Sequence, residues 1–175
     1  ACVLEAGGNA VDAAVAAAFA STIAEPGVSS LGGGGFLLVR AQDGAAQVLD
    51  FFTAVPSGPA GQRETVTVVY SGATQDFHVG NATVAVPGCL DGFWSAHRQW
   101  GGLPLAEVVA PAIEYAANGV ELDARQAHAM ALIEPVLLLT PAARERMAPA
   151  GRLLGEGAAY RDAELAALLT RVAAG

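Results

Sequence analysis

The chain has 175 residues, 53% hydrophobic and 15% charged, which is enough to bury the core of one domain and too apolar for a largely disordered protein. Its net charge of −8, from 17 acidic against 9 basic residues, argues against nucleic acid and anionic lipid surfaces as partners. No run of about 18 uninterrupted apolar residues occurs, so we predict no membrane span.

Two helices are predicted at the N-terminus. Residues 2–6 have an apolar helical pattern that stops at a glycine pair. Asn9 is a suitable N-cap for a helix over residues 10–24, and Asp12 stands at the third position after it, where an acid favours a helix start. A Pro-Gly pair then ends this helix. Its predicted buried face consists of Val11, Ala14, Val15, Ala18, Phe19 and Thr22.

A run of four glycines flows directly into an apolar stretch, since residues 31–39 read LGGGGFLLV. Glycine costs backbone entropy in an ordered element, so the run predicts that the backbone passes where no Cβ fits. The run follows a turn and opens a strand, which is not the arrangement of a phosphate-binding loop. We expect Glu25 and the pair Ser29 and Ser30 to hold the preceding turn through side-chain to backbone hydrogen bonds.

Short strands fill the next part of the chain. Residues 36–40 and 46–51 predict an antiparallel hairpin around an Asp-Gly turn. A loop-rich stretch follows residues 56–59, and residues 65–70 then alternate like a strand. Residues 83–86 predict one more short strand.

Helical patterns occupy the C-terminal half. They cover residues 90–100, 104–118 and 162–174. A further helix starts near Asp123, and a Glu-Pro pair breaks it at residues 134–135. Strands and helices therefore occur in separate runs, which predicts an α+β fold. One side of the first of these helices carries Phe93, Trp94, His97 and Trp100, and we expect both tryptophans to lie in the core.

Cysteine and histidine are too sparse for a metal centre. Cys2 and Cys89 form no CxxC motif, and we interpret both as small buried side chains. His78, His97 and His128 are scattered singly and are expected to be surface or half-buried residues, not general bases. We therefore predict no metal and no cofactor.

Residues 50–53, which read DFFT, are the candidate site that the residues alone suggest. They end the second strand of the hairpin, where side chains often face a cleft, and we expect that cleft near residues 30–56. By strand alternation Phe51 and Phe52 face opposite sides, so one packs in the core and Phe52 is the candidate for a pocket. GxSxG, P-loop and HExxH motifs are absent, and these residues do not specify a reaction.

The order of several short motifs resembles the gamma-glutamyltranspeptidase family. They are GGNAVDAAVA at residues 7–16, EP at 25–26, LGGGGF at 31–36, VPG at 86–88, LPL at 103–105 and VAPAI at 109–113 followed by Gly119. The resemblance covers nearly the whole chain and corresponds to the N-terminal part of the family's large subunit.

The resemblance implies an α+β fold that is part of a four-layer αββα sandwich of the N-terminal-nucleophile hydrolases. Members of this family are precursors that cut themselves, and the Thr freed at the new N-terminus is the nucleophile. It attacks a gamma-glutamyl amide such as glutathione and passes the acyl group to water or to an amine. Its own α-amine can serve as the base, so no separate His is needed. The resemblance implies no cofactor.

Two departures from the family pattern matter. The Thr nucleophile segment is absent, so we expect no catalytic residue in this chain and no activity from it alone. The family typically reads Asp-Phe-Arg-Glu at residues 50–53, and its Arg clamps the substrate's α-carboxylate. Phe52 stands in that place here, which makes Asp50, Phe51 and Phe52 the candidate substrate-binding residues and leaves Arg40 or Arg63 as possible substitutes for the Arg.

Three interpretations stay open. The first is the large-subunit part of a gamma-glutamyltranspeptidase-like enzyme, with hydrolysis favoured over transfer. The second is an amide acylase with a more apolar acyl specificity, and the third is a non-catalytic scaffold or binding domain that lost the nucleophile half.

The expected partners follow from the first interpretation. They are the missing C-terminal portion that bears the Thr, a gamma-glutamyl or acyl-amide substrate, and a second copy in a homo-oligomer. The chain starts without Met and both ends look cut, so we expect residues 1–175 to be a single domain or a fragment. Cytoplasmic and periplasmic or secreted locations both stay open.

Overall fold

The computed structural model describes residues 1–58, 61–70 and 72–175, so Pro59, in the predicted loop, lies outside the described residues. The helices are α1 (Cys2–Glu5), α2 (Ala10–Ala24), α3 (Cys89–Trp100), α4 (Leu105–Asn118), α5 (Ala124–Leu132), α6 (Glu134–Leu137), α7 (Pro141–Met147) and α8 (Ala163–Ala174), with a 3-10 turn η1 (Asn81–Thr83). The strands are β1 (Phe36–Arg40), β2 (Ala46–Asp50), β3 (Glu64–Tyr70), β4 (Ala73–Val79), β5 (Val120–Glu121) and β6 (Ala159–Tyr160). The predicted α+β class is confirmed.

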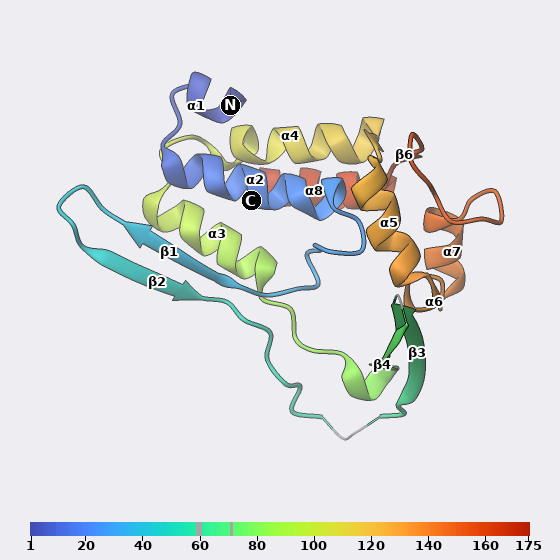
Figure 1. Cartoon of the computed structure of the whole chain (residues 1–175). Helices are drawn as coiled ribbons and strands as arrows, with labels where there is room; N and C mark the ends of the chain where they lie inside the picture. Colours follow the sequence, from blue (N-terminus) through green and yellow to red (C-terminus); the bar gives the residue numbers. More distant parts are fainter. Residues whose placement is uncertain (59–60, 71) are drawn as a thin grey trace.

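The main core lies between the helices α2, α3, α4 and α8. Helix α4 packs against both α2 and α8, and α3 lies along the other side of α2 (Figure 1). Alanines on the facing surfaces let the helix backbones approach closely. The core side chains with little or no exposure are Val15, Phe19, Ala96, Val108, Val109, Ala112 and Leu169.

The predicted hairpin is formed by β1 and β2, which pair from Phe36 opposite Asp50 to Arg40 opposite Ala46. Its turn contains Gly44 with a positive φ of 88°. Leu37 and Leu49 share one face and pack against the helical core. The hairpin is therefore a two-stranded ribbon with one face on the helices (Figure 1).

A second hairpin, β3 with β4, stands apart from the first and contacts α5 and α6. Strand β3 was predicted, but its partner β4 was not, because ATQDFHV lacks a continuous apolar or β-branched signal. The strand predicted at residues 83–86 is wrong: residues 81–83 form η1, and only Val86 bridges, to Ala54. Thr83 Oγ1 donates to the carbonyl of Gly80 and closes a turn there, and the next residue after Val86 is a proline, which has no N–H for a ladder.

The C-terminal helices begin and end where local signals indicate. Asp123 caps α5 and accepts the Gln126 N–H, while the Gln126 side chain accepts the Asp123 N–H. Helix α5 ends at Leu132, and α6 starts at the Glu-Pro pair, so the predicted break is confirmed. Asp162 caps α8. None of the helices in the described part of the chain is long and apolar enough to cross a membrane.

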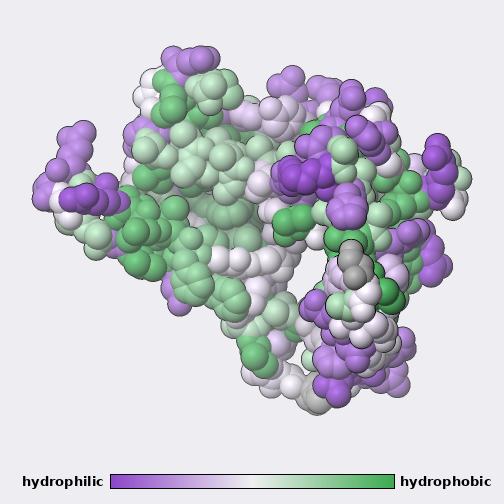
Figure 2. Space-filling model, in the orientation of Figure 1, coloured by the Kyte–Doolittle hydropathy of each residue, from purple (hydrophilic) through white to green (hydrophobic). Residues whose placement is uncertain are grey.

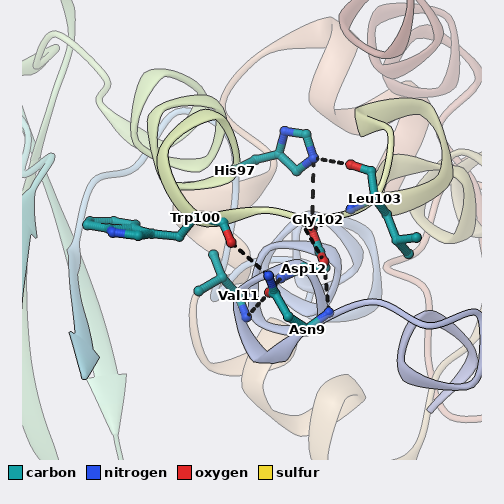
Figure 3. A network of polar contacts seen from close by, with 7 residues as sticks. All are labelled: Asn9, Val11, Asp12, His97, Trp100, Gly102 and Leu103. Atoms are coloured by element: carbon teal, nitrogen blue, oxygen red, sulfur yellow. Dashed lines mark hydrogen bonds and ion pairs between the residues drawn. The ribbon is translucent and has the colours of Figure 1, made fainter. Parts of the chain in front are cut away.

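One buried carboxylate joins the start of α2 to the loop between α3 and α4 (Figure 3). Asp12 is fully buried and accepts hydrogen bonds from the backbone N–H groups of Asn9 at 2.8 Å, Gly102 at 3.0 Å and Leu103 at 3.4 Å. The Asn9 side-chain amide donates to the carbonyl of Trp100 at 2.7 Å. His97 Nε2 donates to the Leu103 carbonyl at 2.7 Å and lies 3.9 Å from Asp12.

This network exceeds the capping role that the sequence predicts for Asp12. Its carboxylate binds Gly102, which is 90 residues away in the sequence. Because Asp12 is buried, the buried face of α2 differs from the predicted one. The observed face consists of Asp12, Val15, Ala16, Phe19, Thr22 and Ile23, so only Val15, Phe19 and Thr22 of the predicted set are buried.

Two other predictions of burial are wrong. Cys2 is exposed, because the short α1 lies at the edge of the helical layer. Trp94 is 40% exposed and carries the Arg98 guanidinium over its ring at 5.1 Å. The spacing of apolar residues along a helix is the same for a core tryptophan and for a surface tryptophan covered by an arginine, so the spacing did not separate the two. Trp100 packs partly buried against the core, and Cys89 is buried.

We predict that Asp12→Asn lowers the free energy of unfolding of the full-length protein by about 2–3 kcal/mol, because the new amide turns donor atoms toward backbone donors that now bind a carboxylate. The midpoint of urea unfolding measures this. Asp91→Asn is the matched control, since Asp91 is an exposed acid in the first turn of α3. Equal midpoints for the two variants would contradict a supporting role for the Asp12 carboxylate.

Candidate functional site

The glycine run lies between the end of β2 and the start of α3. Gly35 and Phe51 exchange both backbone hydrogen bonds, at 3.0 and 3.3 Å, which continues the hairpin ladder beyond the strands. The carbonyl of Gly33 accepts the N–H groups of Gly88 at 2.9 Å and Cys89 at 3.1 Å. The run therefore joins the hairpin to the first turn of α3.

Two glycines on either side of Phe51 leave no room for a side chain. A Cβ on Gly34 would lie 2.5 Å from the nitrogen of Thr53, and a Cβ on Gly88 would lie 2.0 Å from the carbonyl oxygen of Phe51. Both neighbours are backbone atoms, which cannot swing aside. The prediction that the backbone passes where no Cβ fits is confirmed at Gly34, whereas a Cβ on Gly32 would meet only Ser30 Oγ at 3.4 Å.

Phe51 and Phe52 face opposite sides, as strand alternation predicts. The Phe51 ring meets Phe93 edge to face, with centroids 5.8 Å apart and planes at 76°, and Gly92 leaves the space for it. Phe52 is 61% exposed and stacks on Phe36, with centroids 5.6 Å apart and planes at 14°. Phe51 thus lies on the side of the helical core, and Phe52 lies on the open side.

Asp50 fixes the backbone at this point. Its Oδ1 accepts the N–H of Phe52 at 3.0 Å, which forms a turn that aims the chain off the end of β2. Asp50 is exposed and, by alternation, is on the same face as Phe36 and Phe52.

The open face of the hairpin is apolar and uncovered by the rest of the described chain. We call it the hairpin face and define it by Phe36, Leu38, Val48 and Phe52, which are each 61–66% exposed. In Figure 2 it forms a continuous hydrophobic region over β1 and β2. Contiguous exposed apolar surface of this kind is typical of an interaction or ligand site.

Neither arginine proposed as a substitute is placed beside Phe52. Arg40 ends β1 four residues from Phe36, about 13 Å along the strand, and its guanidinium reaches the turn at Gly44. Arg63 precedes β3, on the other hairpin.

The turn before the glycine run is held differently from the prediction. The carbonyl of Glu25 accepts the N–H groups of Val28 and Ser29, while the Glu25 carboxylate binds Arg125 at 2.8 and 3.2 Å. The Ser29 hydroxyl bonds that of Ser21 at 3.1 Å. The expected side-chain to backbone bonds are absent from the described contacts, because α5 brings Arg125 across from 100 residues away.

A cavity of about 410 Å³ adjoins this turn. Its lining includes Ser29, Ser30 and Leu31 from the turn and Arg146 and Tyr160 from the C-terminal part of the chain. Only residues 30 and 31 belong to the predicted cleft. Arg146 is already paired with Asp162 and Glu164, and burial first, then the Asp162 charge, raises the pKa of the Tyr160 hydroxyl.

Comparison with known proteins decides the family. The sequence model described as gamma-glutamyltranspeptidase matches residues 1–175. The chain belongs to the gamma-glutamyltranspeptidase family. The acylase ACY 1 proenzyme of Pseudomonas sp. strain SE83 is 35% identical over 98% of this chain, and the glutathione hydrolase proenzyme of Pseudomonas aeruginosa is 38% identical over 71% of it.

A solved structure agrees with this assignment. The gamma-glutamyltranspeptidase of Helicobacter pylori matches 98% of this chain and 49% of its own, with a TM-score of 0.83 and 28% identity. The chain spans only 32% of the acylase proenzyme and 22% of the glutathione hydrolase proenzyme. The match that establishes the family therefore covers only part of the length of these relatives.

We predict that Gly34→Ala lowers the stability of the full-length protein by about 1–3 kcal/mol or more, because its methyl group must displace the backbone of residues 51–53. The melting temperature and the yield of folded protein report the change. Gly32→Ala is the control with room for a methyl group and should melt close to the unaltered protein. Equal losses of stability in the two variants would mean that the close approach of Gly34 to residues 51–53 does not exclude a side chain.

Proposed function

We propose that residues 1–175 form one unit, the N-terminal part of the large subunit of an amide hydrolase and acyl transferase. The nucleophile is an N-terminal Thr supplied by a portion of the protein outside this sequence. Membership of the gamma-glutamyltranspeptidase family carries this proposal, and the relatives described as proenzymes support a precursor that is processed into two subunits.

In this proposal the chemistry is acyl transfer through a covalent intermediate. The Thr hydroxyl attacks the amide carbonyl while its α-amine takes the hydroxyl proton, and the C–N bond breaks as that proton passes to the leaving amine. Water, or a second amine, then attacks the acyl-enzyme and frees the Thr. This chain contributes no catalytic residue, and its part is to shape and support the acyl site.

The first candidate acyl group is gamma-glutamyl, as in glutathione, with hydrolysis favoured over transfer. The second is a more apolar acyl group, and one observation favours it. By the resemblance described above, Phe52 takes the place of a carboxylate-binding Arg, and in the structure it stacks on Phe36. Losing the charged partner of a carboxylate costs about 2–5 kcal/mol.

The partner in this proposal covers the part of the hairpin face nearer the turn, where Leu38 and Val48 pair. In a four-layer αββα sandwich the sheet formed here has helices on one side only, so its other side packs on a second sheet. Leu38 and Val48, each about two-thirds exposed, are suited to that contact. A chain deprived of the partner is expected to bury this face against a second copy.

The full-length protein tests the proposal and its acyl specificity together. We predict that it cuts itself before a Thr, which intact mass detects, and that it hydrolyses an acyl p-nitroanilide. Phe52→Arg should raise the kcat/KM for the gamma-glutamyl substrate and lower that for apolar acyl substrates, each by about tenfold or more, since a carboxylate gains a cationic partner.

Val55→Arg is the matched control, because it adds the same charge three residues away at a side chain that is 91% exposed. It should leave the ratio of the two activities unchanged. Unaltered kinetics in Phe52→Arg would remove Phe52 from the acyl site. A full-length protein without self-cleavage and amide hydrolysis would leave the scaffold interpretation.

We also predict that the isolated 175-residue chain associates with itself and binds an apolar dye, because the hairpin face lacks its cover. Leu38→Asp should weaken both, as measured by sedimentation and dye fluorescence. Val69→Asp is the control on the second hairpin, where Val69 has a similar exposure of 65%. A wild-type monomer that binds no dye would contradict the proposed covering of this face.

A further inference from the structure

We infer that Phe36 and Phe52 together form an aromatic shelf that receives an acyl group bearing an aromatic ring. The inference rests on the proposed function and deepens it, because it names the acyl class and adds Phe36 as a second specificity-determining residue. Phe36 comes from the start of β1 and Phe52 from just beyond β2, so the shelf straddles both strands at the end of the hairpin away from its turn.

The geometry of the pair suits an incoming ring. The two rings are nearly parallel, at 14°, with centroids 5.6 Å apart, and the residues are 62% and 61% exposed. Most of their aromatic surface is therefore open on the side away from the helices. Offset-stacked and edge-to-face contacts with a third ring are the arrangements that aromatic side chains favour.

The shelf is held in place before any ligand arrives. Phe36 is paired with Asp50 in the ladder, and Asp50 Oδ1 accepts the Phe52 N–H at 3.0 Å. On the other side the backbone of Gly34 lies so close to residues 51–53 that a Cβ would be 2.5 Å from the Thr53 nitrogen. Little conformational freedom is left to lose on binding, which favours affinity.

The charges nearby select against a carboxylate on the acyl group. Asp50, an exposed acid, is on the same face as both rings. The cation on this face, Arg40, lies about 13 Å away along the strand, and its guanidinium is at the turn. An anionic acyl group would thus meet a like charge without a partner, whereas an uncharged aryl group would meet only apolar carbon.

The same rings could instead be ordinary contacts with the missing portion, and the arrangement of the hairpin face separates these roles. Leu38 and Val48 pair with each other nearer the turn and carry no aromatic stack. They provide a surface of similar exposure that belongs to the interface alone. Substitutions there affect assembly, whereas substitutions in the shelf affect the choice of acyl group.

The test uses the full-length, self-cleaved protein and three p-nitroanilides that differ only in the acyl group: phenylacetyl, hexanoyl and gamma-glutamyl. Phe36→Leu should lower the kcat/KM for the phenylacetyl substrate about five- to tenfold relative to hexanoyl, mainly through KM, because the stack is lost while the apolar volume is kept. Phe36→Tyr retains the ring and should restore the preference. Leu38→Ala, the control, should alter all substrates by one common factor.

The outcomes distinguish this inference from the proposed function. Hydrolysis with the same acyl preference in Phe36→Leu and the unaltered protein overturns the shelf and leaves the proposed function standing. Loss of self-cleavage or of hydrolysis in the unaltered protein overturns both. If Phe36→Leu does not fold, competitive inhibition of the unaltered protein decides: phenylacetate must inhibit at least fivefold more strongly than hexanoate, and equal inhibition overturns the shelf.

Discussion

The arrangement of the helices depends on the buried carboxylate of Asp12. Its hydrogen bonds to the N–H groups of Gly102 and Leu103 fix where α3 ends and α4 begins relative to α2. A carboxylate buried among backbone donors has no equally good alternative partner, so this geometry is specific. Helix α3 then holds the Phe93 ring against the Phe19 ring, with their centroids 5.1 Å apart. This contact places an aromatic surface below the hairpin.

The open site follows from that placement. Phe93 and the space at Gly92 take up the ring of Phe51, and alternation then turns Phe52 outward. Gly34 and Gly88 let three backbone segments meet around this point, so the direction of residues 51–53 is set by steric contact. The position of Phe52 thus depends on a series of contacts that starts at α2 and passes through α3 to Phe51, between side chains that are distant in sequence.

Local signals predicted most of the elements and few of their contacts. The Asn9 and Asp162 caps, the Asp-Gly hairpin and the Glu-Pro break each depend on neighbouring residues, and each was found where expected. The partners of Asp12 and Glu25 lie about 90 and 100 residues away, and β4 is stabilised mainly by β3, so no local pattern identified them. At the candidate site, alternation separated Phe51 from Phe52 correctly, whereas the stacking of Phe36 on Phe52 required the register of the two strands.

In the proposed acyl site, Phe52 is linked to two neighbours, Phe36 and Asp50. An arginine at residue 52 would have the Phe36 ring and the Asp50 carboxylate as its neighbours. Asp50 accepts the Phe52 N–H and so holds the backbone, and in the proposed acyl site its charge also repels an anionic acyl group. A change at residue 52 alone would leave Phe36 exposed without its stacking partner. In the proposed acyl site the two rings and the acid therefore act as a unit, and the proposed acyl preference belongs to that unit.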